Sequence, residues 1–521
     1  MPLHRLHLLL LIAVLALAGC AGLPPRGTPA PSQAFTDTGQ TALARIAEAS
    51  RPPGETAPSG FRVLPAGEYA LNARLALAQR AQRSLDLQYY HLHNDHAGRL
   101  LLRALRDAAA RGVRVRLLLD DFYAAEVDEL LLGLAAHDNV EVRLFNPLPL
   151  RRGPPVLRLL LSPGDFERHN HRMHNKLFVA DNAMTLYGGR NIGDEYFMSA
   201  RDANFVDFDV LSTGQVVQDM SAVFDRYWNS DVVWPLHSVL AAPADAAAAR
   251  AQFDAAVRAL PPVVADYEID PLGQPPVEQQ LEAGRLALIH GRAQVFADPP
   301  AKAIDGAPGN RPTDAMQGLL QAFTTARVQL TIVSPYFVPS EVGMSMMRLG
   351  ARHGVRTVLF TNSIASTDEP LVHAHYSRYR TEMLRLGVKI YEFNPTQTQR
   401  TRTFGSFGRS TPRLHAKVAI VDRHRLLVGS VNFDARSAIG NTEMGVVIDS
   451  PPLTEGLIRM MEGRSGANLY QLRLAADDTT IEWHGTDESG QPTVSTEEPN
   501  ASAWLRFKLW LQSLFVEERL L

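Results

Sequence analysis

The sequence predicts an α/β protein made of two lobes related by a pseudo-twofold axis. At 521 residues the chain is too long for one ordinary hydrophobic core, so two domains or lobes are expected. Strand-like runs alternate with helical runs, which is typical of largely parallel or mixed sheets covered by helices. The same succession also occurs twice: His174 and His415, like Gly188 and Gly429, stand about 240 residues apart.

The N-terminus has the pattern of an export signal. Arg5 precedes an apolar run, Leu8 to Ala18, which is too short to span a bilayer and typical of a signal-peptide core. The run ends in the letters LAGC, and their cysteine, Cys20, is the only one in the chain. This resembles the lipobox of bacterial lipoproteins, with an ordinary secretory signal as the alternative. The resemblance implies an exported protein lipidated on Cys20 at the periplasmic face of a membrane, and Ala21 favours the outer over the inner membrane.

Composition divides the chain into six expected segments. Proline-rich letters follow Cys20, and an alanine-rich stretch separates the two repeats. The segments are a signal peptide (1–19), the lipidated cysteine with a tether and a lead-in helix (20–60), a first lobe (61–235), a helical connector (236–295), a second lobe (296–455) and a C-terminal extension (456–521).

The last apolar stretch, AWLRFKLWLQSLFVEERLL, has helical spacing. Trp504, Phe507, Leu511 and Leu514 fall on one face of the expected helix. A helix docked on the body is favoured over one that lies in a membrane interface.

Charge and cysteine content narrow the function classes. The formal net charge of −3 gives no general attraction to nucleic acid, and one cysteine allows no internal disulfide. Lysine is rare beside arginine, so the positions of the lysines are informative.

Both halves contain the pattern His-x-Lys-x4-Asp, and each copy is followed by a glycine-containing turn, GGRN or GSVN. One such pattern would be weak evidence, whereas two at equivalent places in a repeat indicate a shared function. The two copies are His174, Lys176, Asp181 and His415, Lys417, Asp422.

With these residues the sequence resembles the phospholipase D superfamily, whose motif is HxKxxxxD followed by GSxN. Within it, the runs RMHNKLFVADNAMTLYGGRN, SPYFVP and VGSVNFDARSAIGNTEMG resemble bacterial cardiolipin synthases of the C type. The first half departs from the motif at Gly189, where serine is usual, so one hydroxyl donor is missing there. The resemblance implies two facing lobes with the active site between them.

These residue types suit phosphodiester chemistry. One histidine can attack phosphorus as a neutral imidazole while the other donates a proton to the leaving alkoxide. Two lysines supply positive charge to the phosphoryl oxygens, so no metal and no cofactor are expected. The family pattern makes His174 the nucleophile and His415 the acid and base, although the pseudo-symmetry also permits the reverse.

Further residues are expected to support this centre. Asn191, Asn432 and the Ser430 hydroxyl are candidate phosphate donors. The resemblance suggests Glu443 as the hydrogen-bond partner of His415, and Asp207 as its counterpart for His174. Asp181 and Asp422 are expected to pin the motif loops rather than to transfer protons.

The first functional hypothesis is a phosphatidyltransferase that makes cardiolipin by passing a phosphatidyl group, through a phosphohistidine, to phosphatidylglycerol; phosphatidylethanolamine is a possible second substrate. A phospholipase D that hydrolyses phospholipid to phosphatidic acid would use the same motifs, because the difference lies in acceptor binding and water exclusion. A nuclease or other phosphodiesterase is less favoured, since the charge and the lipobox argue against a nucleic-acid partner. A non-catalytic envelope protein is the remaining alternative. The sequence leaves the oligomeric state open.

Overall fold

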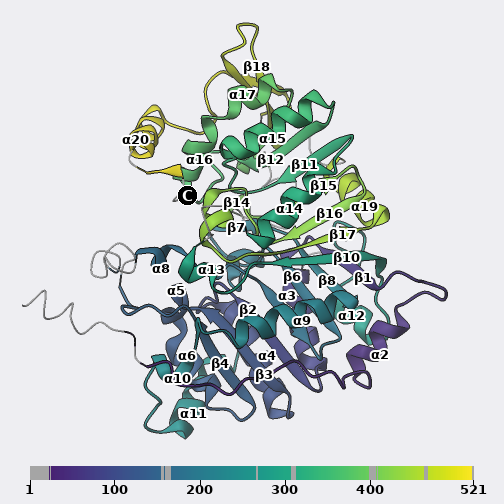
Figure 1. Ribbon diagram of the computed structural model, residues 1–521, viewed down its shortest axis with the longest axis vertical. Helices are drawn as coiled ribbons and strands as arrows, with labels where there is room; N and C mark the ends of the chain where they lie inside the picture. Colours follow the sequence, from purple (N-terminus) through teal and green to yellow (C-terminus); the bar gives the residue numbers. More distant parts are fainter. Residues whose placement is uncertain are drawn as a thin grey trace, which may run out of the picture.

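Figure 1 shows the computed structural model, in which two α/β lobes are stacked along the long axis of the molecule. The expected signal peptide (1–19) and the expected lipidation site Cys20 lie outside the described residues. The structure describes residues 23–518 apart from 24, 154–157, 159–165, 264, 266–267, 307–312, 398–406, 408, 463–467, 488 and 515.

The sheet of the first lobe runs in the order β1-β8-β6-β5-β2-β3-β4-β9. Its strands are β1 (Ser59–Leu64), β2 (Ser84–Tyr89), β3 (Arg114–Asp120), β4 (Val140–Phe145), β5 (Leu177–Ala180), β6 (Met184–Gly188), β8 (Asp209–Gly214) and β9 (Val233–Pro235).

The sheet of the second lobe repeats this order as β10-β17-β16-β15-β11-β12-β13-β18 and continues into β19 and β20. Its strands are β10 (Ile289–Ala297), β11 (Gln329–Val333), β12 (Arg356–Asn362), β13 (Lys389–Phe393), β15 (Val418–Val421), β16 (Arg425–Gly429), β17 (Met444–Asp449), β18 (Leu469–Leu474), β19 (Ile481–Thr486) and β20 (Pro492–Ser495).

The two sheets join edge to edge. Strand β1 pairs antiparallel with β10, so each lobe contributes its first strand to the junction. The strand orders on the two sides of this junction mirror each other, which is the arrangement a pseudo-twofold axis produces. The predicted two-lobed α/β fold is therefore confirmed.

The sheets are mixed rather than mainly parallel. Among the described strands of these two sheets, parallel pairing is confined to β2-β3-β4 and β11-β12-β13, the strands linked by crossover helices. The hairpins β5-β6 and β15-β16 add antiparallel strands, because a short turn can join only antiparallel neighbours.

Helices pack on both faces of the sheets. Those of the first lobe and connector are α2 (Ala42–Ala49), α3 (Gly67–Arg80), α4 (His96–Ala110), α5 (Asp121–Ala124), α6 (Asp128–Ala135), α8 (Phe166–Asn170), α9 (Gln215–Trp228), α10 (Leu236–Val239), α11 (Ala246–Val257) and α12 (Val277–Glu282). Those of the second lobe are α13 (Lys302–Asp305), α14 (Asp314–Thr324), α15 (Ser340–Arg352), α16 (Pro370–Ser377), α17 (Arg380–Arg385), α19 (Pro451–Glu462) and α20 (Ala503–Ser513). In the described part of the chain, no helix is long and apolar enough to cross a bilayer.

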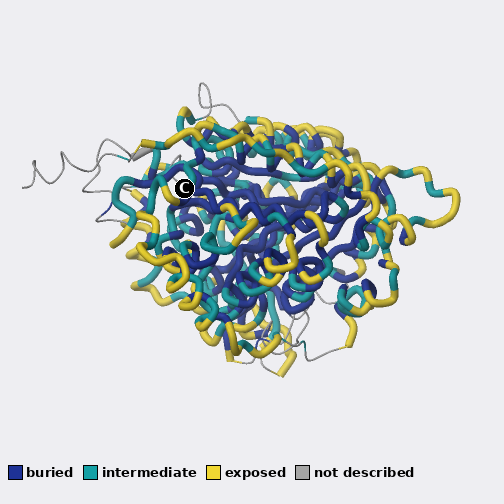
Figure 2. The backbone as a smooth tube through the Cα atoms, turned by 90° about the horizontal axis from the view of Figure 1, so that it is seen from below, coloured by how far each residue is buried: buried dark blue, intermediate teal, exposed yellow. Residues whose placement is uncertain are grey.

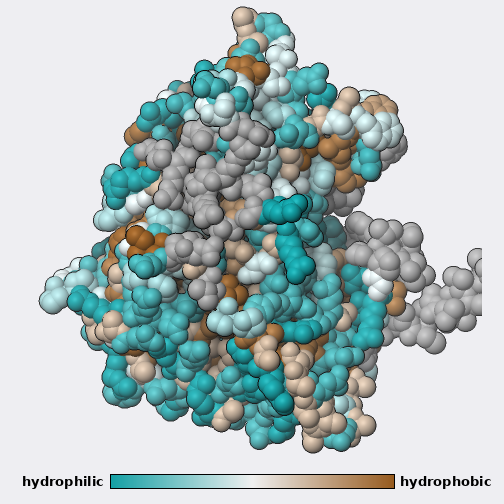
Figure 3. All heavy atoms as spheres, turned by 180° about the vertical axis from the view of Figure 1, so that it is seen from behind, coloured by the Kyte–Doolittle hydropathy of each residue, from teal (hydrophilic) through white to brown (hydrophobic). Residues whose placement is uncertain are grey.

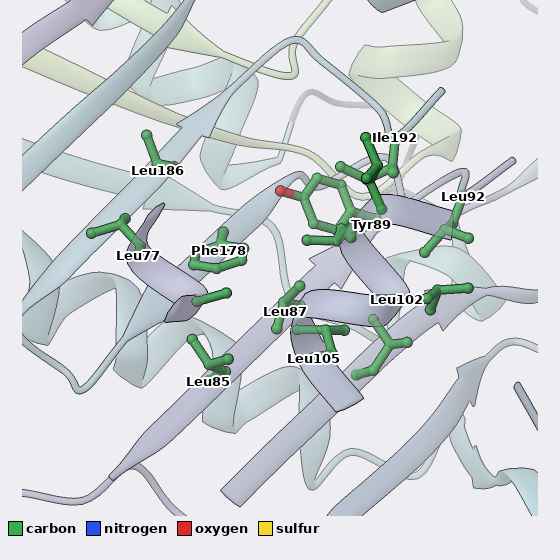
Figure 4. Packing of buried hydrophobic residues seen from close by; sticks show 14 of the residues in the cluster. Leu77, Leu85, Leu87, Tyr89, Leu92, Leu102, Leu105, Phe178, Leu186 and Ile192 are labelled. Atoms are coloured by element: carbon green, nitrogen blue, oxygen red, sulfur yellow. The ribbon is translucent and has the colours of Figure 1, made fainter. Parts of the chain in front are cut away.

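Helix α4 illustrates how the sequence specifies these elements. The Asp95 carboxylate accepts a hydrogen bond from the Gly98 amide and caps the first turn. Leu101 and Leu105 then project into the core at helical spacing. Gly112 follows the helix with φ of +90°, a conformation that glycine adopts without strain. Figure 4 shows this leucine face packed against β2.

One hydrophobic core is shared by both lobes. It combines Phe224 of α9 and Val179 of β5 with Val418 of β15 and Leu457 of α19. Figure 2 shows the corresponding band of buried backbone through the centre of the molecule. Each lobe also has a buried cluster of its own, and the shared cluster joins the two lobes, so the halves are expected to stabilise each other.

The N-terminal tether is bound to the first lobe over its described part. Arg26 donates to the Val233 carbonyl at 2.7 Å, and the Ala34 amide donates to Asp225 at 2.8 Å. Arg143 donates to the Ala30 carbonyl. The described part of the expected tether, from Arg26 onward, therefore lies against the first lobe.

Candidate active site

The two motifs meet because each is paired with the backbone of the other lobe. Strand β14 (Thr411–Leu414), which leads into His415, pairs with β7 (Ala203–Val206) of the first lobe. The His415 amide then donates to the Val206 carbonyl at 2.8 Å. In the same way, the His174 amide donates to the Thr442 carbonyl at 2.9 Å. Each histidine is thus held beside the residue that precedes the carboxylate of the opposite lobe.

The carboxylate partners are consequently crossed between the lobes. Nδ1 of His174 lies 3.1 Å from both carboxylate oxygens of Glu443. Nδ1 of His415 lies 2.6 Å from Oδ2 of Asp207. The expected pairing of Glu443 with His415 and of Asp207 with His174 is therefore wrong. The physical reason is the cross-lobe strand pairing, which places each carboxylate under the histidine of the other motif.

The two lysines occupy equivalent places. Lys176 Nζ donates to the His174 carbonyl at 2.6 Å, and Lys417 Nζ donates to the His415 carbonyl at 2.5 Å. An aromatic ring flanks each pair: Tyr90 lies 5.3 Å from the His174 ring, centroid to centroid. Because all four side chains are buried and converge from two lobes, the cluster can surround one phosphoryl group.

Both histidine rings favour the neutral state. Burial lowers the pKa of His174 to about 4, against the opposing effect of the Glu443 carboxylate. Burial and the neighbouring charge of Lys417 also lower the pKa of His415, although Asp207 opposes this. A neutral imidazole whose Nδ1 donates to a carboxylate presents an unprotonated Nε2, which is the form that attacks phosphorus.

The lysines are less basic than usual and the carboxylates more acidic. Burial lowers the pKa of Lys417 to about 8 and that of Lys176 well below its ordinary value. Burial alone would raise the pKa of Asp207, but His415 and Lys417 hold it at about 2. The pKa of Glu443 is likewise lowered by the cations beside it, in spite of burial. Both carboxylates are therefore ionised. Asp207 is stabilised by His415 and Lys417, and Glu443 by His174 and Lys176.

The expected phosphate donors near the glycine-containing turns have different hydrogen-bond partners. Asn191 and Asn432 are buried beside the motifs, and Asn191 shares a hydrogen bond of 3.0 Å with the Tyr196 hydroxyl. The Ser430 hydroxyl instead donates to Glu443 and accepts from the Met444 amide. The Ser430 hydroxyl therefore helps to hold Glu443 in place.

Gly189 is explained by the carboxylate of its own lobe. A Cβ at this position would lie 2.2 Å from Oδ1 of Asp207, so the carboxylate fills the space of the missing side chain. In the second lobe, Ser430 takes the equivalent place and hydrogen-bonds Glu443, which is one methylene longer. The two lobes thus pair a short carboxylate with glycine and a long one with serine.

We expect Gly189→Ser to reduce activity, although it restores the usual family motif. The new Cβ must displace Asp207, and His415 loses the position of its Nδ1 partner. A displacement of this kind is expected to reduce turnover by about 10²-fold. Lipid turnover of Gly189→Ser and of the matched variant Ser430→Gly, measured together with thermal unfolding, checks this. Unchanged or higher activity of Gly189→Ser would show that the space is available.

Asp181 and Asp422 hold the strands that precede the site residues. Asp181 accepts the amide hydrogens of three consecutive residues, 82–84, at the start of β2. Asp422 does the same for residues 327–329 at the start of β11. Both carboxylates are engaged by these backbone amides at the far end of the motif strand. This geometry supports the expectation that Asp181 and Asp422 hold the motif loops in place.

We expect Asp181→Ala to destabilise the protein by about 3 kcal/mol, because three amide groups lose a charged acceptor in a buried setting. Denaturant unfolding of the variant and of Asp181→Asn, which keeps an acceptor oxygen, measures the loss. Turnover per folded molecule should stay close to that of the unchanged protein. Full stability combined with lost turnover would instead mean that Asp181 takes part in the chemistry.

Sequence reasoning missed a buried support around Glu443. Ser437, on a π-helical turn over Arg436–Gly440, donates its hydroxyl to Glu443 at 2.9 Å. Lys302 donates to the Ser437 carbonyl and to Asp298, which accepts from the Glu443 amide. The rarity of lysine could have drawn attention to Lys302, but its sequence distance of more than a hundred residues from the motif hides the connection.

Two overlapping groups of described residues have ligand atoms close enough to hold a metal ion. They are His91, His93 with Glu126, and His93, Asp95 with Glu195. His91, His93 and Asp95 lie on the segment after β2, whereas Glu126 and Glu195 come from the 3-10 turns Ala125–Val127 and Asp194–Tyr196. The two groups do not include the histidines or lysines of the two motifs.

Comparison with known proteins agrees with this geometry. The chain matches the family described as "Cardiolipin synthase, PLD-like domain" over residues 75–228 and 319–464, and each part contains one motif. It is 38% identical over 457 residues to cardiolipin synthase C of Escherichia coli (strain K12), covering 87% of this chain and 94% of that protein. It is 26% identical over 387 residues to the cardiolipin synthase of Geobacillus kaustophilus (strain HTA426), covering 74% and 62%.

A solved structure has the same fold. The phosphatidylserine synthase of Haemophilus influenzae Rd KW20 superposes with a TM-score of 0.56 at 14% sequence identity, covering 87% of this chain and 93% of that one. The chain therefore belongs to the phospholipase D superfamily, in the family of PLD-like domains of the cardiolipin synthase type.

Proposed function

We propose that this protein is a phosphatidyltransferase that makes cardiolipin through a phosphohistidine intermediate. The observation that carries the proposal is the pair of buried His–Lys groups, one from each lobe, with each ring oriented by a carboxylate of the other lobe. The relationship to cardiolipin synthase C supplies the substrate class. The catalytic residues are His174, Lys176, His415 and Lys417.

In the first step, Nε2 of His174 attacks phosphorus of the donor phospholipid. The bond from phosphorus to the leaving alcohol breaks, and His415, protonated when the anionic substrate is bound, gives that oxygen a proton. Lys176 and Lys417, with Asn191 and Asn432, stabilise the charge on the phosphoryl oxygens. The product is a phosphatidyl group on His174.

In the second step, the hydroxyl of phosphatidylglycerol gives its proton to the now neutral His415 and attacks phosphorus. The bond from phosphorus to His174 breaks, and cardiolipin leaves. Water in place of the hydroxyl would yield phosphatidic acid, so hydrolysis is the second candidate function. The near-complete burial of the two rings favours transfer, because it limits the access of water.

The purified protein incubated with phosphatidylglycerol, with and without phosphatidylethanolamine, tests the proposal when the lipid products are separated. Cardiolipin formation supports transfer. Phosphatidic acid as the sole product would replace transfer by hydrolysis. Cleavage of DNA without turnover of lipid would reject both candidates.

We also propose that the protein is exported and anchored by a lipid on Cys20 at the periplasmic face, with the outer membrane favoured. The expected division into a signal peptide, a tether, two lobes, a connector and an extension is part of this proposal, except that β10 and β18 to β20 are counted with the second lobe, whose sheet they join. Because the tether is bound to the first lobe from Arg26 onward, few residues separate the anchor from the folded body.

We expect labelled palmitate to be incorporated into the protein in a bacterial host and to be absent from Cys20→Ser. Ala21→Ser, which keeps the cysteine, is the matched control. An unlabelled native protein, or a labelled Cys20→Ser variant, would contradict lipidation at this residue.

A further inference from the structure

Helix α20 exposes an apolar face to solvent. Trp504 and Trp510 are 70% and 56% exposed, although tryptophan is usually well buried. Figure 3 shows the region of this helix projecting at the upper right, where apolar side chains gather on the surface. The large exposed apolar residues of the helix and the position after it are Trp504, Phe507, Trp510, Leu511 and Leu514.

This face is exposed although the helix itself is firmly docked. Leu509 and Ser513 are buried, and α20 packs on α16. The Arg378 guanidinium donates to the backbone oxygen of Ser513 at 3.0 Å and to its hydroxyl at 2.8 Å. At about 100° per residue, the exposed apolar side chains lie on the side of the helix opposite to Leu509 and Ser513. The favoured expectation of a docked helix is thus correct for one face only.

The composition of the exposed face fits a lipid interface. Tryptophan, phenylalanine and leucine on one side of a short helix, with a lysine close to them, are typical of helices that lie in the headgroup region of a membrane. Lys508 is exposed within this face and can reach anionic headgroups. Monomeric soluble proteins rarely leave so many large apolar side chains together in water.

Helix α20 is linked to the cleft between the lobes through one other helix. Helix α16, on which α20 packs, begins directly after Asp368 and Glu369. Asp368 accepts a hydrogen bond of 2.7 Å from the Tyr336 hydroxyl. The Tyr336 ring stands 5.9 Å from Lys417 Nζ and flanks His415. Helix α20 is thus connected to the second motif through α16, Asp368 and Tyr336.

Apolar surface continues beyond the end of the helix. Glu518 borders a cavity of about 870 Å³ between α14 and α15, lined mostly by apolar side chains such as Phe323 and Met346. Phe433, the residue after Asn432, also lines this cavity. In the first lobe, the equivalent helices α3 and α4 pack against each other. The second lobe thus has an apolar cavity whose lining includes residues next to the second motif and a residue after α20.

We propose that the apolar face of α20 inserts into the interfacial region of a phospholipid surface and holds the cleft against it. This inference rests on the proposed function, because that function supplies phospholipid as the substrate. The helix then adds a second membrane contact to the anchor expected at Cys20. A bilayer substrate would be reached without leaving the surface.

Quenching of tryptophan fluorescence tests the insertion directly. The full chain is bound to vesicles of phosphatidylglycerol and phosphatidylethanolamine that carry brominated acyl chains. Trp228 and Trp483 are buried, and Trp234 is half-buried on β9 of the first lobe, so quenching should come mainly from Trp504 and Trp510. It should disappear in Trp504→Phe/Trp510→Phe, which keeps the apolar face. Bound native protein without quenching would overturn the proposal, whether or not the protein turns over lipid.

A second experiment measures the effect on turnover. Phe507→Ser/Leu511→Ser should lower the rate on vesicles by about tenfold or more and leave the rate on detergent-dispersed lipid nearly unchanged. Ile269→Ser/Val328→Ser is the matched control, since both residues are exposed and apolar but lie away from α20. Equal rates of both variants on vesicles would overturn the proposal.

The same material separates the remaining outcomes. A native dimer that dissociates in Phe507→Ser/Leu511→Ser would identify the face as an interface between copies and overturn lipid insertion. A native protein that is quenched by brominated lipid but turns over no lipid would reject the proposed function and support the insertion.

Discussion

Replacement of His174 or of His415 by alanine is expected to reduce lipid turnover by about 10⁴-fold or more, and the double variant should be no less active than either single one. The reason is that the two rings act on the same phosphorus, so losing one leaves the other without a partner. Turnover of native protein and of the three variants on phosphatidylglycerol measures this. Tyr90→Phe is a control, because it retains the aromatic ring beside His174. Partial, additive losses would mean that the rings do not form one catalytic unit.

A donor with a good leaving group distinguishes the two rings. With a p-nitrophenyl phosphatidyl ester, the leaving group needs no proton, so the acid becomes dispensable for the first step. We expect His415→Ala to form the labelled phosphatidyl-enzyme from this ester and His174→Ala to form none. The opposite result would assign the nucleophile to His415. The attack requires a neutral ring at His174, and burial lowers the pKa of this histidine to about 4.

The motif residues could be predicted from the sequence because their spacing acts within one strand. His174 and Lys176 stand two residues apart before β5, so they share one face of the extended chain whatever the rest of the fold does. The repeat then predicts that His415 and Lys417 do the same before β15. Asp181 could be interpreted for a similar reason, since its partners are the amides at the start of a neighbouring strand.

The partners of the histidines could not be predicted in this way. Which carboxylate lies under which ring depends on the pairing of β14 with β7 and on the bridge between Met173 and Thr442, both of which connect the lobes. Such contacts join segments more than two hundred residues apart and carry no local spacing signal. Internal symmetry favours matching partners within a half, and the structure shows that the match is made across the halves.

The crossed arrangement also explains why the protein needs both halves in one chain. Each motif supplies a histidine to one pair and its lobe supplies the carboxylate to the other pair. The shared core beneath them contains side chains from both sheets. A separated lobe would expose this core and leave its histidine without a carboxylate. Each copy of the repeat therefore provides only half of the active site.

The crossing leads to the second large effect. We expect Glu443→Gln and Asp207→Asn each to reduce turnover by about 10²- to 10⁴-fold, because a neutral amide neither fixes the required tautomer nor stabilises the imidazolium. Both carboxylates raise the pKa of the ring they contact. Glu443→Gln should therefore lower the pKa of His174 further, and Asp207→Asn should lower that of His415.

NMR titration of isotope-labelled histidines separates these assignments, because each ring reports on its own carboxylate. The signals are identified by their loss in His174→Ala and in His415→Ala. In Glu443→Gln, the titration of His415 should change much less than that of His174, and Asp207→Asn should give the reverse. Each variant is thus the control for the other, matched in charge and burial. If Glu443→Gln moved only the His415 titration, the carboxylates would serve the histidines of their own lobes, and the cross-lobe contacts would have no part in setting the protonation of the site.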